Sequence, residues 1–172
     1  MILTGKEINK EIRDGNITIT PFNSEQINPN SYNYRLSDTI KIFEAMDGCR
    51  PIFKEIKIPT DGLILEPQQL YLAHTYEIIG SSKYAMSLIG RSSLGRLGLF
   101  LQISANLGHT TVKHKWTLEL FAIKKIILYP KMIIGQVSFW ENKGDITEYD
   151  GKYGKLNKSQ ESFKYKNHDF NR

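Results

Sequence analysis

Nine short runs rich in Ile, Val, Tyr, Phe and Thr recur along this chain, and they constrain its fold more than any other feature. Turn sequences such as Asn-Pro, Pro-Thr-Asp-Gly and Tyr-Pro-Lys separate them. β-Branched and aromatic residues favour strands, and many short strands separated by turns predict an all-β sandwich or barrel rather than alternating strands and helices. The runs are Ile17–Ile19, Tyr32–Leu36, Ile40–Phe43, Leu70–Thr75, Tyr84–Ile89, Phe100–Ser104, Trp116–Ala122, Ile126–Tyr129 and Ile133–Trp140.

A single short helix is predicted, close to the N-terminus. Thr4 with Glu7 three residues later forms a capping-box pattern. Ile8 and Ile12 share one helical face, and Gly15 provides a natural C-terminal stop.

The length of 172 residues suits one domain, residues 1–172, with a core large enough to be stable without disulfides. Cys49 is the only cysteine, which rules out an internal disulfide and a multi-cysteine metal site within the chain. The sequence contains no apolar stretch of transmembrane length and no signal-peptide pattern. We therefore expect a cytoplasmic protein that does not associate with a membrane.

The composition changes after residue 141. From Asn142 to Arg172 aliphatic residues nearly vanish, whereas Lys, Asn, Ser, Tyr and Gly dominate. Such a composition is typical of disorder, yet five aromatic residues lie within it. We expect this polar C-terminal tail, residues 142–172, to close over a ligand.

Basic residues are concentrated in the middle of the chain. Between Ser81 and Lys131 there are eight lysines and arginines, and Glu119 is the only acid. A field of this sign attracts polyanions such as nucleotides or nucleic acid. We expect Lys124 and Lys125 to be merely solvated. The eight are Lys83, Arg91, Arg96, Lys113, Lys115, Lys124, Lys125 and Lys131.

The segment Gly90–Leu99 reads Gly-Arg-Ser-Ser-Leu-Gly-Arg-Leu-Gly-Leu and follows a predicted strand. A serine-rich turn at the end of a strand can leave backbone N–H groups pointing outward, where they favour anions. The guanidinium groups of Arg91 and Arg96 present forked donors that match phosphate oxygens. This segment is therefore a candidate phosphate-binding turn, although a solvated polar turn would have the same composition.

The sequence lacks the motifs of several common enzyme and nucleotide-binding families. There is no Walker-type phosphate loop, dinucleotide fingerprint or Gly-x-Ser-x-Gly elbow. Zinc-dependent deaminases use a His/Cys/Cys set, which one cysteine cannot supply. His109 and His114 are five residues apart in a predicted loop, so a metal role is disfavoured. We expect no protein-bound zinc or other resident metal.

Glu119 is the candidate acid–base residue. Period-2 alternation places it with Thr117 and Phe121 on one face of a predicted strand, opposite Leu118 and Leu120. A glutamate in this position ordinarily faces water. As the lone acid in a basic window beside Phe121, it is instead suited to stay ionised and accept a proton.

The motif series resembles the signature of the dCTP deaminase family, in the dUTPase-like superfamily. The matching segments are Gly90–Leu99, Ile103-Ser104-Ala105 and Thr117-Leu118-Glu119-Leu120, supported by the opening Met1-Ile2-Leu3, the run Asn28–Leu36 and the turn Tyr129–Gln136. They occur in the family's order over most of the chain, up to about Trp140. A lone Arg-Ser-Ser would be far less specific.

The resemblance implies a distorted jelly-roll fold assembled as a homotrimer with active sites between subunits. It implies zinc-free hydrolysis of dCTP to dUTP and ammonia, with Mg²⁺ carried on the triphosphate. The catalytic set carried over is Glu119, Ser92, Arg96 and the backbone carbonyl of Ala105. The nucleotide-binding set is Arg91, Ser92, Ser93, Arg96, Ile103, Asn106, Lys152, Tyr153 and Gln160.

Three departures from the family pattern stand out. His109 occupies the position of an aspartate that in dUTPases activates water, so we expect little or no release of pyrophosphate. Asn106 stands where the family often has histidine. In the tail, Leu156 replaces the glutamine expected three residues after Tyr153, and Gln160 could serve only if the intervening loop is longer.

Three alternative functions remain open on the sequence. The first is a dUTP or dCTP diphosphohydrolase, which His109 disfavours. The second is a non-catalytic nucleotide-binding homologue, which the altered loop makes plausible. The third, a β-barrel that binds single-stranded nucleic acid, is disfavoured because the aromatic residues fall mainly at core or tail positions.

Overall fold

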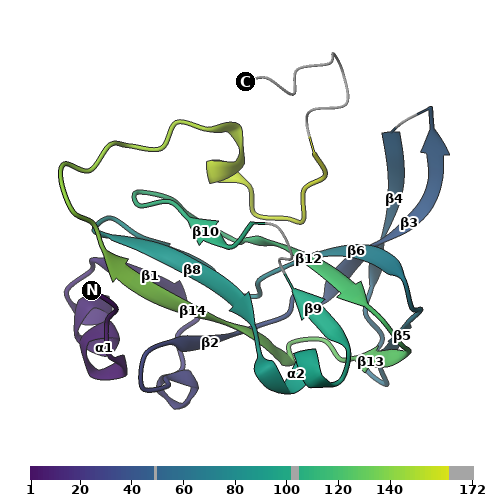
Figure 1. Ribbon diagram of the computed structural model, residues 1–172, viewed down its shortest axis with the longest axis horizontal. Helices are drawn as coiled ribbons and strands as arrows, with labels where there is room; N and C mark the ends of the chain where they lie inside the picture. Colours follow the sequence, from purple (N-terminus) through teal and green to yellow (C-terminus); the bar gives the residue numbers. More distant parts are fainter. Residues whose placement is uncertain (49, 102–104, 163–172) are drawn as a thin grey trace.

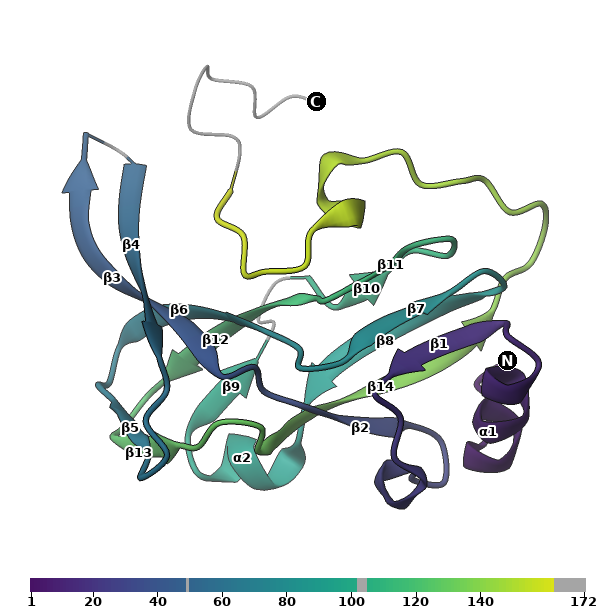
Figure 2. The same cartoon turned by 180° about the vertical axis from the view of Figure 1, so that it is seen from behind.

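Antiparallel β-strands make up most of the regular secondary structure, as Figures 1 and 2 show for the computed structural model, which describes residues 1–48, 50–101 and 105–162. The strands are β1 (Ile17–Thr20), β2 (Tyr32–Arg35), β3 (Thr39–Asp47), β4 (Arg50–Lys57), β5 (Leu63–Leu65), β6 (Gln69–His74), β7 (Ile78–Ser81), β8 (Tyr84–Gly90), β9 (Leu99–Leu101), β10 (Leu107–Gly108), β11 (Lys113–His114), β12 (Thr117–Ala122), β13 (Ile126–Leu128) and β14 (Ile133–Glu141). The helices are α1 (Gly5–Arg13), α2 (Ser92–Arg96) and the 3₁₀ turns η1 (Ser24–Gln26) and η2 (Lys152–Lys155). Neither α-helix in these ranges is long and apolar enough to span a bilayer.

The N-terminal helix confirms the capping prediction. Thr4 Oγ1 accepts a hydrogen bond from the Glu7 backbone N–H over 3.4 Å, and Ile8 is fully buried. Beyond the C-cap, Gly15 has a φ of +79°, which glycine adopts without the penalty that a Cβ would bring.

Two larger sheets hold most of the core. One has the order β10-β8-β14-β2 and the other β4-β3-β6-β12-β9, while β1-β7-β11 and β13-β5 form smaller sheets. Buried side chains from all four sheets, together with Ile8 of α1 and Leu94 of α2, join one hydrophobic cluster. Figure 1 shows β3 and β4 projecting as a hairpin beyond the rest of their sheet.

Each of the nine runs predicted to be strands coincides with a strand, except that residues 102–104 of the sixth lie outside the described residues. The sequence analysis missed the charged strand β4, the short strands β5, β10 and β11, and β7. It was also wrong about the serine-rich segment, which is helix α2 rather than an open turn. There the Arg91 carbonyl accepts hydrogen bonds from the backbone N–H groups of Leu94 and Gly95, both over 3.0 Å.

Strand β12 has the predicted two-residue alternation. Leu118 and Leu120 are fully buried, whereas Thr117, Glu119 and Phe121 on the opposite face are half-buried. The strand lies between β6 and β9 in its sheet. Its apolar face therefore anchors it in the core and leaves the Glu119 face available for a site.

Candidate active site

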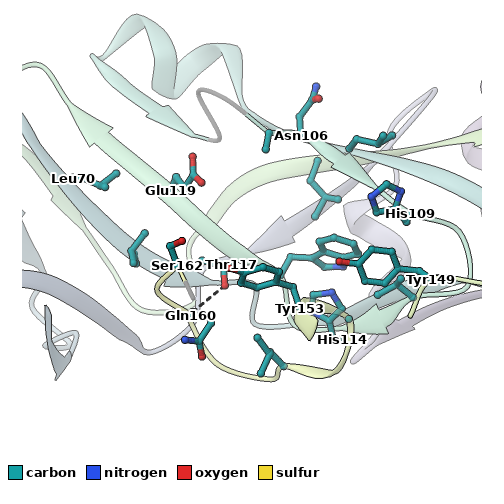
Figure 3. A pocket seen from close by; sticks show the side chains of 18 of the residues that line it. Leu70, Asn106, His109, His114, Thr117, Glu119, Tyr149, Tyr153, Gln160 and Ser162 are labelled. Carbon is teal, nitrogen blue, oxygen red and sulfur yellow. Dashed lines mark hydrogen bonds between the residues drawn. The ribbon is translucent and has the colours of Figure 1, made fainter. Parts of the chain in front are cut away.

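A cavity of about 540 Å³ lies over the Glu119 face of β12 (Figure 3). Segments far apart in the sequence contribute its walls, including β4, β6, β12, the β10–β11 region and the tail. Its lining is Pro51, Phe53, Leu70, Leu72, Leu88, Ala105, Asn106, Leu107, His109, Val112, His114, Trp116, Thr117, Glu119, Tyr149, Tyr153, Gly154, Leu156, Gln160 and Ser162.

Glu119 is the only carboxylate among these lining residues. It stands opposite Leu72 in the β6–β12 register, and both Leu70 and Leu72 line the cavity beside it. Apolar walls lower the local dielectric, which strengthens the interaction of a carboxylate with any charge or dipole that enters. The arrangement suits a proton-transferring group.

Aromatic side chains form the opposite end of the cavity. The rings of His109 and Tyr149 stack with centroids 4.9 Å apart and an interplanar angle of 15°. His114 and Trp116 pack with centroids 4.2 Å apart, and Trp116 Nε1 donates to the Ile79 carbonyl over 2.9 Å. Figure 3 shows the rings of His109, Tyr149 and His114 grouped away from Glu119.

His114 is a buried histidine at this end of the cavity. Burial lowers its pKa, and the carbonyl groups of Lys115 and Leu156 only partly offset this effect. Its Nδ1 lies 2.7 Å from the Lys115 carbonyl oxygen. Because a carbonyl can only accept, we assign the ring proton to Nδ1.

The tail is attached to the cavity wall by hydrogen bonds and an ion pair. The backbone N–H of Gln160 donates to Thr117 Oγ1 over 3.0 Å, and that of Tyr149 donates to Thr111 Oγ1 over 3.0 Å. Further along, Glu161 forms an ion pair with Lys41 of β3 at 3.0 Å. As a result, Tyr149, Tyr153, Gly154, Leu156, Gln160 and Ser162 supply one side of the cavity.

Five of the predicted site residues meet in this cavity, namely Glu119, Ala105, Asn106, Tyr153 and Gln160. Asn106 is exposed at its edge, with Nδ2 3.3 Å from Ser87 Oγ. Lys152 begins η2 next to Tyr153 but does not line the cavity. Ile103 lies outside the described residues.

The predicted phosphate-binding residues Arg91, Ser92, Ser93 and Arg96 do not line the cavity of their own chain. Ser92, Ser93 and Arg96 are exposed on α2. Their proposed roles, like those of the five residues in the cavity, stay predictions.

The described lining of the cavity carries no fixed positive charge. Among the described residues that line it, none is a lysine or arginine. Nor do three His, Cys, Asp or Glu side chains gather anywhere in the described ranges. A triphosphate bound here would need cations from another source.

Sequence reasoning missed the aromatic end of the cavity. The sequence presented His109 and His114 as possible metal ligands and His109 also as the replacement of an aspartate, whereas Tyr149 stood only among the aromatic residues of the tail. One signal could have indicated this contact: the polar tail contains aromatic residues, and the predicted loop contains isolated histidines against which they could stack.

Comparison with known proteins identifies the family. The sequence model described as dCTP deaminase-like matches residues 2–142. A protein of Clostridium beijerinckii named "dCTP deaminase, dUMP-forming" is 45% identical over 170 residues, covering 96% of this chain and 98% of that protein. A "dCTP deaminase" of Rhodopirellula baltica is 38% identical over 170 residues, covering 96% of this chain and 85% of that protein.

A solved structure supports the fold. The crystal structure of the 2'-deoxycytidine 5'-triphosphate deaminase from Agrobacterium tumefaciens matches with a TM-score of 0.66 at 18% identity. The match covers 82% of this chain and 48% of that chain, so this protein spans about half the length of that one. The all-β, dUTPase-like fold class predicted from the sequence is confirmed.

Proposed function

The chain belongs to the dCTP deaminase-like family, and on this premise we propose that it is a hydrolase of nucleotide metabolism that removes the 4-amino group of dCTP. The observation that carries the proposal is the position of Glu119, the single carboxylate among the described residues that line a largely apolar cavity, which the tail closes on one side. The aromatic end and the tail would enclose the nucleotide and exclude bulk water.

In the proposed reaction Glu119 moves protons. It accepts a proton from water as the water oxygen bonds to C4 of cytosine, and passes that proton to the ring nitrogen N3. Glu119 then takes the remaining proton from the new C4 hydroxyl and delivers it to the amino group, so that the C4 carbonyl forms as the C4–N bond breaks and ammonia leaves. Since this route needs no metal-activated water, positioning and proton transfer must supply the rate.

We propose that a second copy of the chain completes the site within a homotrimer. Its α2 would bring Ser92 and Arg96 to the reacting centre and Arg91 to the phosphates, with the Ala105 carbonyl orienting the water. Two observations support this: the cavity lining lacks lysine and arginine within the described residues, and α2 is flanked by the exposed apolar side chains of Leu97 and Phe100.

Mg²⁺ would enter as part of the substrate. It would be held by triphosphate oxygens and water, because the cavity lining offers one carboxylate rather than a ligand set. We also keep the expected cytoplasmic setting, where the nucleotide pool and reduced Cys49 would both be found.

The product is proposed to be dUMP rather than the dUTP predicted from the sequence. Relatives at 45%, 41% and 43% identity are named as dUMP-forming. Forming dUMP consumes two waters per dCTP and releases pyrophosphate with ammonia. The prediction of little pyrophosphate rested on His109, so pyrophosphate is the quantity that decides between the two products.

The test is incubation with dCTP and Mg²⁺, following ammonium, pyrophosphate and the separated nucleotides. We expect ammonium and pyrophosphate in equal amounts, and a loss of roughly 100-fold or more in Glu119→Gln. The matched control is Glu55→Gln, an exposed carboxylate of β4, which should retain wild-type activity. No ammonium from the wild type, or full activity in Glu119→Gln, would refute the assignment, and ammonium without pyrophosphate would make dUTP the end product.

Mixing two inactive variants tests the shared site. Glu119→Gln and Arg96→Gln chains, unfolded together and refolded, should regain about a quarter of wild-type activity, because random pairing unites two intact groups in about one site in four. If both groups came from one chain, mixing would restore nothing.

A further inference from the structure

Three cationic side chains converge on one aromatic ring outside the cavity. Arg35 Cζ lies 4.8 Å from the centroid of the Tyr76 ring, Lys131 Nζ lies 4.9 Å from it, and Lys115 Nζ lies 5.9 Å from it. The four residues come from β2, the β6–β7 connection, the β11–β12 connection and the β13–β14 connection. None of them lines the cavity described above.

Among the described residues, only one of the three cations has a carboxylate partner. Arg35 uses its Nε, 2.6 Å from Glu77 Oε1, and its backbone N–H donates to Glu77 Oε2 over 2.9 Å. Glu77 is fully buried, and each of its two carboxylate oxygens accepts one of these hydrogen bonds from Arg35. Within the described ranges neither Lys115 nor Lys131 has a carboxylate oxygen within 4.0 Å.

The backbone of Lys131 adopts a conformation that is unfavourable for a residue with a Cβ. Its φ is +59°, in the left-handed region that residues with a Cβ rarely adopt. Its backbone N–H donates to the Leu36 carbonyl over 3.1 Å, one residue beyond Arg35. Non-glycine residues in this conformation are concentrated at ligand sites and turns, where the surroundings enforce the strain.

A neighbouring histidine, His74, ends β6 and lies within the electrostatic influence of Lys115. His74 is buried, and its pKa is lowered to about 4, first by burial and then by Lys115, with a smaller contribution from Lys158. Asp38 acts in the opposite direction but does not outweigh them. Arg35, Lys115 and Lys131 carry three positive charges against the one carboxylate of Glu77, so the cluster has an excess of positive charge that the described side chains do not neutralise.

We propose that Arg35, Tyr76, Lys115 and Lys131 form a binding site for a phosphate group, separate from the catalytic cavity. Two ammonium groups, the terminal guanidinium nitrogens of Arg35 and the Tyr76 hydroxyl together supply donors from several directions, which suits a tetrahedral dianion. The phosphate can be free orthophosphate or the phosphate chain of a nucleotide. This inference does not depend on the proposed deaminase activity.

The site also borders the tail. The backbone N–H of Lys115 donates to Asn157 Oδ1 of the tail over 3.2 Å. An anion that orders Lys115 would therefore act on a residue that contacts the tail directly.

The test is calorimetric titration of the full chain with orthophosphate, at ionic strength held constant with chloride so that general screening does not change. In Lys115→Gln/Lys131→Gln we expect the dissociation constant to rise at least about 10-fold. The single substitution Lys131→Glu, at an exposed residue, provides a second measurement and leaves the buried contacts intact. The control Lys124→Gln removes one exposed lysine elsewhere and should bind as the wild type does.

Parallel titrations separate the sources of the phosphate. Orthophosphate, tripolyphosphate and dCTP are compared in the wild type, in the lysine variants and in Arg96→Gln. Loss of orthophosphate binding in the lysine variants with retention in Arg96→Gln supports the site. Absence of binding by the wild type, or loss only in Arg96→Gln, overturns it. Light scattering of the lysine variants gives a further check. A changed mass of the assembly together with unchanged phosphate binding also overturns the site, because the cluster would then receive a carboxylate from a second copy.

Discussion

The backbone N–H of Gln160 donates a hydrogen bond to Thr117 Oγ1 over 3.0 Å, which joins the tail to β12 two residues before Glu119. Both threonine and glutamate lie on the face of the strand that lines the cavity. The position of the tail is therefore coupled directly to the strand that carries the proposed catalytic group.

Thr117→Val removes the acceptor while keeping the shape of the side chain. We expect the tail contact to weaken by about 1 kcal/mol and the KM for dCTP to rise several-fold, with a smaller change in kcat. Hydrogen exchange at the Gln160 amide should accelerate. Thr18→Val, in β1 away from the tail, is the control, and equal exchange rates at Gln160 in all three proteins would contradict the coupling.

The stack of His109 on Tyr149 gives the second prediction. These rings, 4.9 Å apart, connect the β10–β11 loop to the tail, and their loss in Tyr149→Ala should weaken tail closure by about 1 kcal/mol. We expect a raised KM for dCTP and faster tryptic cleavage after Lys152 or Lys155. Tyr149→Phe keeps the ring and should behave as the wild type, so a similar defect in both variants would show that the hydroxyl rather than the stack matters.

The parts of the fold that local sequence determines were predictable. The Thr4 cap, the burial of Ile8 and the alternation in β12 follow from the immediate neighbours of each residue, since helix and strand periods place side chains on fixed faces. The short strands β5, β10 and β11 were missed because two or three residues carry no period, and β4 was missed because charges hide the alternation in a projecting hairpin.

The site was predictable only as a set of candidates. Motif order singled out Glu119, Asn106 and Tyr153, which do share a cavity. The pairing of His109 with Tyr149 joins positions 40 residues apart, and no local pattern encodes a contact of that separation. Likewise, local sequence could not indicate that α2 lies outside the cavity of its own chain.

The lowered pKa of His74 predicts that the folded protein loses stability in acid. Its pKa is lowered to about 4 in the folded protein, first by burial and then by Lys115, against about 6.5 when unfolded. Between these values the unfolded chain binds a proton that the folded chain does not, so stability falls as pH drops from 6.5 to 4. This histidine should contribute roughly 1–3 kcal/mol of that loss.

The measurement is urea unfolding of the wild type and His74→Leu across this pH range. The variant should lose less stability on acidification, and the remaining slope should include His114, whose pKa burial also lowers. Parallel stability curves for the two proteins would show that His74 is protonated equally in both states.

Gly135 of β14 is packed directly under an aromatic ring. A Cβ at this position would overlap the ring of Tyr34, which is fully buried and whose hydroxyl donates to the Ile89 carbonyl over 3.1 Å. Gly135→Ala should therefore destabilise the protein by about 2–3 kcal/mol, because a buried ring cannot move aside without breaking its own packing. The matched control is Gly95→Ala in α2, where a Cβ meets no atom within 4 Å and should raise stability by about 0.5 kcal/mol. Thermal unfolding of the wild type and both variants checks this prediction. Equal melting temperatures for Gly135→Ala and the wild type would mean that Tyr34 has room to shift.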